Sequence, residues 1–203
     1  ADISHMFYNA ESFNQDLSNW DVSGCSPISL FEGATSFNQD LKNWKFNKYY
    51  NGRSLNKMFK NAISFNGDIS SWSVKNVTHM DEMFMGAHSF NKDISKWDVS
   101  NVIKMDRMFS GAVSFNQNLT NWNINFKLNL KNPSGIFYKA TNFNLLNNPF
   151  EQKVKKSVNK VENKELNADD KKIISKFKKL FQSEDLDIVN MGIQLIRSIE
   201  REV

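Results

Sequence analysis

The chain has 203 residues, of which 40% are hydrophobic and 13% aromatic, with 26 Lys and Arg against 22 Asp and Glu. This composition is too apolar for a disordered polymer, and no run of about twenty apolar residues could span a bilayer. The formal charge of +4 is shared evenly between the two halves, so we expect no nucleic-acid partner. A single cysteine, Cys25, excludes an internal disulfide framework and a multi-cysteine metal site.

A unit of about 25 residues recurs from the N-terminus to residue 150. The opening residues ADISHMF align with IKMDRMF at 103–109; we recognise no signal peptide in them and expect the chain to be a piece of something longer. Length varies only between each Trp and the next Met-Phe, where we expect the extra residues to bulge out as a loop. Three aromatic columns keep the register: Phe7, Phe31, Phe59, Phe84, Phe109 and Phe137; Phe13, Phe37, Phe65, Phe90, Phe115 and Phe143; and Trp20, Trp44, Trp72, Trp97 and Trp122, ending at Phe150.

Within a unit, apolar residues recur at steps of three and four, which predicts a short helix with one buried face. The residues in the fifth unit are Val102, Met105, Met108, Phe109 and Ala112. The segment around the Trp, such as DISKWDV, predicts a short strand. The position two residues after the first Phe favours the left-handed conformation, and it is occupied by Asn9, Gly33, Asn61, Gly86, Gly111 and Lys139.

These patterns predict an α/β repeat solenoid, with leucine-rich-repeat-like coils of a short strand plus a short helix and a C-terminal α-helical hairpin. A coil of this size cannot bury its own aromatic residues, so each coil supplies a hydrophobic wall for the next. We assign residues 1–150 to about six coils, the first truncated, residues 151–168 to a Lys-rich linker, and residues 169–203 to the hairpin.

The stretch MFMGAHSFNKDISKWDVSNVIKM, from Met83 to Met105, resembles the BspA-like surface-protein repeat, also called the mycoplasma-type lipoprotein repeat. The resemblance covers residues 1–150, and this family is related to leucine-rich repeats. It implies cell-surface or secreted proteins used for adhesion and host contact, often anchored by lipid or to the wall, without catalytic activity. No catalytic residue is carried over, because the motif is a packing motif.

Two polar columns accompany the aromatic ones. We interpret the Asn column as a structural ladder of buried amides, each of which forms hydrogen bonds to the next coil. The Asp column, Asp16, Asp40, Asp68 and Asp93, could bind calcium, but Asn118 replaces the fifth member, so we favour turn-capping. The ladder residues are Asn14, Asn38, Asn66, Asn91, Asn116 and Asn144.

The remaining chemically active residues predict no catalytic or metal site and no cofactor. His5, His79 and His88 occupy three different repeat positions, and Cys25 has no repeat-consistent histidine beside it. The Trp column could form an exposed stacking platform for sugars or bases, but we favour a place in the core.

A candidate interaction surface remains in the positions that differ between coils, since variable columns of a solenoid face its partners. Neutral drift of exposed residues is an equally weighted alternative. The residues are Lys42, Lys45, His79, Glu82, Lys92, Lys96, Asp98, Lys104 and Arg107.

The tail changes composition after Phe150. Ile173, Phe177 and Phe181 lie on one predicted helical face, and Ser183 offers the N-cap of a second helix. This helical pair either caps the open end of the solenoid, which we favour, or docks onto another protein.

Our leading hypothesis is a non-enzymatic binding protein that presents a variable surface to a protein or glycan partner, at the cell surface or secreted by family resemblance alone. The alternative is a structural scaffold subunit of a larger assembly that contacts partners through its helical tail. The sequence leaves the oligomeric state open.

Overall fold

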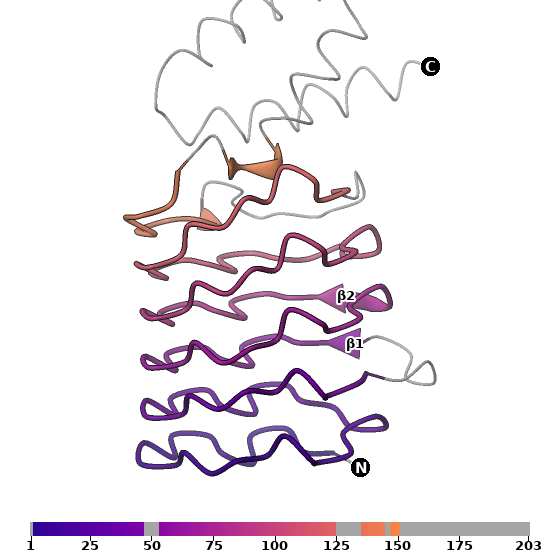
Figure 1. Cartoon of the computed structure of the whole chain (residues 1–203), viewed down its shortest axis with the longest axis vertical. Helices are drawn as coiled ribbons and strands as arrows, with labels where there is room; N and C mark the ends of the chain where they lie inside the picture. The colour runs from indigo at the N-terminus through magenta and orange to yellow at the C-terminus, as the bar shows by residue number, and fades with distance from the viewer. Residues whose placement is uncertain (1, 47–52, 125–134, 145–146, 151–203) are drawn as a thin grey trace, which may run out of the picture.

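The computed structural model describes residues 2–46, 53–124, 135–144 and 147–150. The chain winds into flat coils that lie on top of one another along the long axis of the molecule, starting from the N-terminus (Figure 1). We number these coils by the second phenylalanine column, from coil one with Phe13 to coil six with Phe143. The predicted linker at 151–168 and hairpin at 169–203 lie outside the described residues.

The strands in the described ranges are short and lie on one side of the stack. β1 (Arg53–Ser54) pairs in parallel with β2 (Val77–His79), in the next coil. Isolated parallel bridges join Asp2 to Ser26 and His79 to Lys104. Adjacent coils therefore run in the same direction, as a parallel ladder requires.

Tight turns follow these bridges, and their N–H groups alternate between two kinds of partner. The N–H of Met85 donates to the carbonyl of Glu82 in its own coil at 3.1 Å. The N–H of the next residue, Gly86, donates to the carbonyl of Ser110 in coil five at 2.8 Å. The alternation recurs along the stack, so each coil satisfies part of its backbone only through its neighbour.

These turns stand where the apolar spacing predicts a short helix, so that local prediction is wrong. Met105, Met108 and Phe109 are buried as expected, but Arg107 and Gly111 have φ of 54° and 72°. A positive φ at every fourth residue is incompatible with a right-handed helix. Consecutive turns bury apolar residues at steps of three and one, as one face of a helix does, but they do not form a helix.

The predicted strand around each Trp is also replaced by a turn. The N–H of Ser95 donates to Oδ1 of Asp93 at 2.9 Å, and the N–H of Trp97 donates to the carbonyl of Ile94 at 3.1 Å. The side-chain cap and the tight turn bend the backbone away from the extended conformation. The leucine-rich-repeat-like class stays a prediction.

The expected left-handed column is confirmed, because all six residues have positive φ, between 54° and 76°. Three are glycines, which adopt this conformation without steric cost. A second left-handed column lies four residues earlier and contains no glycine: His5, Ser29, Lys57, Glu82 and Arg107.

Stacked aromatic rings fill the interior of the coils. Phe59 lies 3.8 Å from Phe65 in its own coil, centroid to centroid, and 5.6 and 5.7 Å from Phe31 and Phe84 in the coils on either side. All four rings are fully buried. Burying one such side chain contributes about 1.5–3 kcal/mol, so these columns make a large apolar contribution to stability.

Four of the five tryptophans lie in the core, in agreement with our preferred interpretation. Trp44, Trp72, Trp97 and Trp122 are at most 4% exposed. The indole N–H of Trp72 donates to the carbonyl of Leu41 in the preceding coil at 2.8 Å, and the other three make the equivalent bond. Each indole thus joins two coils by packing and by a hydrogen bond.

The Asn column lies at the surface, not in the interior where we expected it. Asn91 is exposed, and its N–H donates to Oδ1 of Asn66 at 3.0 Å, while its own Oδ1 accepts from the N–H of Asn116 at 2.9 Å. The same bond joins Asn14 to Asn38, Asn38 to Asn66 and Asn116 to Asn144. At this outer corner the side-chain amides take the place of backbone carbonyls as acceptors between coils, and they can stay in contact with water.

A second side-chain ladder runs beside the turns, and its residues are half-buried. Oδ1 of Asn56 accepts from the N–H of Asp81 at 2.8 Å, and Oδ1 of Asp81 accepts from the N–H of Asp106 at 2.9 Å. Burial raises the pKa of Asp81 above its usual value, although the hydrogen bond from Asp106 opposes this. Ionisation of Asp81 therefore costs folding free energy at neutral pH.

Substituting Gly67 by alanine should destabilise the stack more than substituting Gly24. Neither glycine has a positive φ, but a Cβ at Gly67 would clash with the backbone carbonyl of Gln39 in the preceding coil, whereas a Cβ at Gly24 would meet no atom within 4 Å. Overpacking of this kind costs about 1–3 kcal/mol. Thermal unfolding of the two variants measures the difference, and equal losses would contradict the packing described.

Asp81→Asn should stabilise the protein near pH 7. The amide keeps an oxygen for the N–H of Asp106, as Asn56 does for Asp81, and removes the cost of ionising a half-buried carboxyl. Because the folded-state pKa of Asp81 is raised, the advantage should shrink as the pH falls through its titration range. Melting temperatures between pH 3 and pH 8 would refute this if the variant were less stable at pH 7, or if the difference did not change with pH.

Candidate functional site

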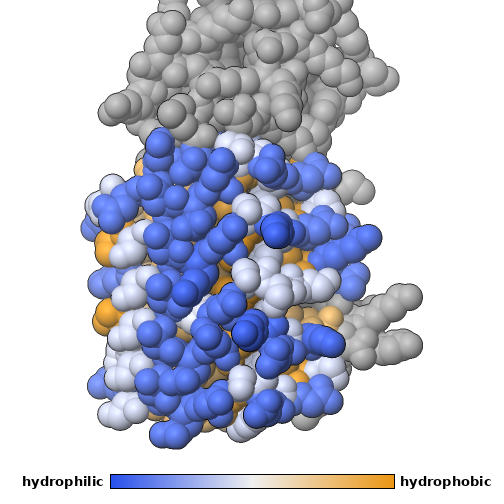
Figure 2. Space-filling view, viewed as in Figure 1, coloured by the Kyte–Doolittle hydropathy of each residue, from blue (hydrophilic) through white to orange (hydrophobic). Residues whose placement is uncertain are grey.

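The repeated columns leave few of their functional groups to solvent. The phenylalanines and tryptophans of the inner coils are buried, and the repeated Asn side chains bond to the next coil. The face seen in Figure 2 is mainly hydrophilic, with narrow hydrophobic strips between the polar residues. Many of the functional groups that this part of the chain presents to solvent therefore belong to side chains that differ from coil to coil, such as Lys42 and Lys96.

A polar hollow of about 380 Å³ opens at the surface between coils one and two. Lys42 and Asn43 are exposed beside it, and Asp16 and Asp40 bring two carboxyl groups. Its lining residues are Asp16, Ser18, Asn38, Gln39, Asp40, Lys42 and Asn43.

The carboxyl groups of the hollow are held by backbone N–H groups. Oδ1 of Asp16 accepts from the N–H of Ser18 at 2.8 Å, and this bond keeps the pKa of Asp16 below its usual value. Oδ1 of Asp40 accepts from the N–H of Asp68 in coil three at 2.7 Å. Asp16 is therefore ionised at neutral pH and fixed in orientation.

The Gln39 side chain is fixed as well. Its Nε2 donates to the backbone carbonyl of Asn14 at 3.0 Å and to the side-chain oxygen of Asn14 at 2.9 Å. The hollow thus combines preoriented carboxylates and carboxamides with the ammonium of Lys42. This set can both donate to and accept from the hydroxyl groups of a sugar or the polar side chains of a protein.

Three of the four residues of the Asp column cap turns, whereas Asp40 accepts a bond from the next coil. Asp68 and Asp93 accept from the N–H groups two residues ahead, those of Ser70 and Ser95, as Asp16 does from Ser18. Asn118 makes the same bond to Thr120 at 3.0 Å. An uncharged amide fills the position because the turn needs an acceptor and not a charge.

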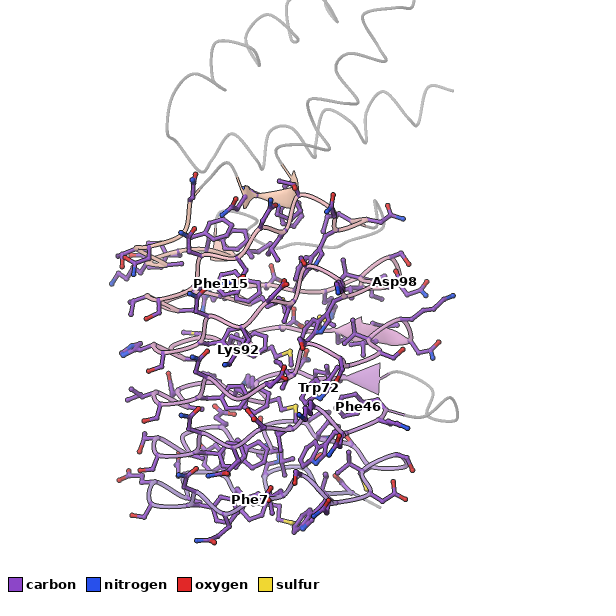
Figure 3. The ribbon with its side chains drawn as sticks, viewed as in Figure 1. Phe7, Phe46, Trp72, Lys92, Asp98 and Phe115 are labelled. Carbon is purple, nitrogen blue, oxygen red and sulfur yellow. The ribbon has the colours of Figure 1, made fainter. Side chains whose placement is uncertain are left out.

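The nine residues of the candidate interaction surface do not form one patch. Lys92 lies in the left half of Figure 3 and Asp98 at the right, on different sides of the stack. Lys42, Lys45, Lys96, Asp98 and Arg107 are exposed, and the other four are half-buried. Lys42 is the member that lines the hollow.

Two of the half-buried members make contacts within the stack. Glu82 pairs with Lys60 at 2.8 Å, and Lys60 lies 3.5 Å from Glu32, so the three charges join coils two, three and four. His79 belongs to β2, where its Nδ1 lies 2.8 Å from the Thr78 hydroxyl. These contacts give Glu82 and His79 structural roles.

Sequence analysis singled out four of the seven lining residues, in three separate sets, and missed Ser18, Gln39 and Asn43. Gln39 belongs to the column directly after the ladder Asn, which reads Gln15, Gln39, Gly67, Lys92 and Gln117. This variation was a usable signal, but it led us only to Lys92. That Asp16 and Ser18 of coil one lie beside Gln39 of coil two appears only once the coils are stacked.

Comparison with known proteins gives a family and no closer relative. No curated protein and no solved structure matches the chain. Among the described residues, no helix has the length and apolar character needed to cross a membrane. A family model matches residues 1–54 and 53–180, well over half of the chain, which therefore belongs to the family described as "Mycoplasma protein of unknown function, DUF285".

Proposed function

We propose that this chain is a non-enzymatic binding protein that recognises a protein or glycan partner through the side of its coil stack. One observation carries the proposal: the repeated side chains are used in contacts between coils, whereas exposed charged side chains such as Lys42 and Lys96 vary from coil to coil. A rigid stack with a variable surface is the usual design of a repeat protein that binds a partner.

The hollow between coils one and two is the best candidate for the contact. Its groups are preorganised by hydrogen bonds to the backbone, so a ligand would not have to order them on binding. Lys42 and Asn43 stand at its exposed side and vary along the stack. Placement at a cell surface, for adhesion or host contact, rests on the resemblance to BspA-like repeats.

Replacing Lys42 and Asn43 together by alanine should weaken partner binding at least tenfold, the loss expected for two contacts near the centre of an interface. The full chain would be screened on a glycan array and against surface-protein extracts, and affinities for each hit measured by titration. Both side chains are exposed, so the melting temperature should stay nearly unchanged.

Lys96→Ala is the matched control, because Lys96 occupies the repeat position of Asn43 in coil four and is also exposed. It should leave the affinity unchanged. A partner that binds the Lys42 and Asn43 variant as tightly as the natural chain would rule out the hollow. Turnover of a captured partner would instead point to an enzyme.

A further inference from the structure

The N-terminal face of coil one exposes groups whose equivalents in the inner coils are buried. Trp20 is 42% exposed and Met6 about half, whereas Trp44 and Leu30, at the same repeat positions of coil two, are 1% and 0% exposed. Phe7 stacks on Phe31 at 5.4 Å on one side, but no ring of the described part of the chain lies in the position that Phe31 occupies for Phe59. The aromatic columns thus end at an uncovered surface.

The same face carries hydrogen-bond donors whose equivalents in later coils bond to the preceding coil. The indole N–H of Trp44 donates to the carbonyl of Leu17 at 2.8 Å, and the N–H of Asn38 donates to Oδ1 of Asn14 at 2.8 Å. Among the described residues, the indole N–H of Trp20 and the backbone N–H of Asn14 make no such bond. Both bonds would need acceptors from a coil lying before coil one.

On the turn side of the coil, this face also carries carbonyl acceptors whose equivalents in coil two bond to the preceding coil. The carbonyls of Leu30 and Glu32 accept from the N–H groups of Phe7 and Asn9 in the preceding coil, at 3.0 and 2.7 Å. Their equivalents one repeat earlier are the carbonyls of Met6 and Tyr8, which accept no backbone N–H among the described residues. Donors on one side and acceptors on the other define the partner's orientation.

We propose that the N-terminal face of coil one is a docking surface for one further coil of the same aromatic and asparagine repeat. Such a coil, running in the same direction, covers Phe7 with its own ring and offers an Asn side-chain oxygen to the N–H of Asn14. Its backbone supplies an acceptor to Trp20 and donors to the carbonyls of Met6 and Tyr8. This occupant would repeat the contacts that join each described coil to the next.

The test adds one coil to the full chain. A copy of residues 78–102 is placed directly before Ala1, in the register in which these residues precede Ile103. It brings Asn91 and Ile94, whose oxygens accept from Asn116 and from the Trp122 indole in their natural place. In the matched control, the added copy carries Ser at the positions of Phe84 and Phe90.

Exchange of the Trp20 indole N–H and the Asn14 backbone N–H, followed by NMR, reports on the face. We expect both to exchange at least tenfold more slowly in the extended chain than in the unextended chain and the control. Unchanged exchange in the extended chain would overturn the proposal. Slow exchange that develops with concentration in the unextended chain would assign the face to a second copy instead, and would overturn it as well.

Discussion

The structure depends on sharing of backbone hydrogen bonds between coils. The N–H of Gly86 bonds to coil five, the Trp72 indole bonds to coil two, and the ladder asparagines bond at the outer corner. A buried backbone group without a partner is costly, so a coil removed from its neighbours would lose much of its stability. The fold is therefore a property of the stack and not of any single unit.

This constraint separates the residues that join the coils from the residues that are free to vary. Side chains that complete contacts between coils, such as Trp72 and Asn91, recur along the stack because neighbouring junctions are built in the same way, although Phe150 takes the Trp position in coil six. Side chains that point away from the junctions are free to vary, and they supply the charge of the surface. The hollow beside Lys42 follows from this division, because it mixes fixed backbone-bound groups with variable ones.

The repeat made the buried columns predictable, since the Phe and Trp positions recur at a fixed spacing. It indicated one left-handed position in each coil, but it could not show that turns replace the expected helix, because the spacing of Met105, Met108 and Phe109 fits a helix equally well. Arg107 and its equivalents adopt positive φ without being glycine, so tertiary contacts override local preference there. The hollow was hidden for a related reason: its residues come from two coils and meet only after stacking.

Hydrogen exchange in the variant Asn91→Ala tests this account most directly. The side-chain oxygen of Asn91 accepts from the N–H of Asn116, whereas the N–H of residue 91 bonds to Asn66. The account predicts that the N–H of Asn116 loses at least tenfold of its protection while that of residue 91 keeps most of its own. Unchanged protection at Asn116 would contradict the claim that neighbouring coils hold one another through these bonds.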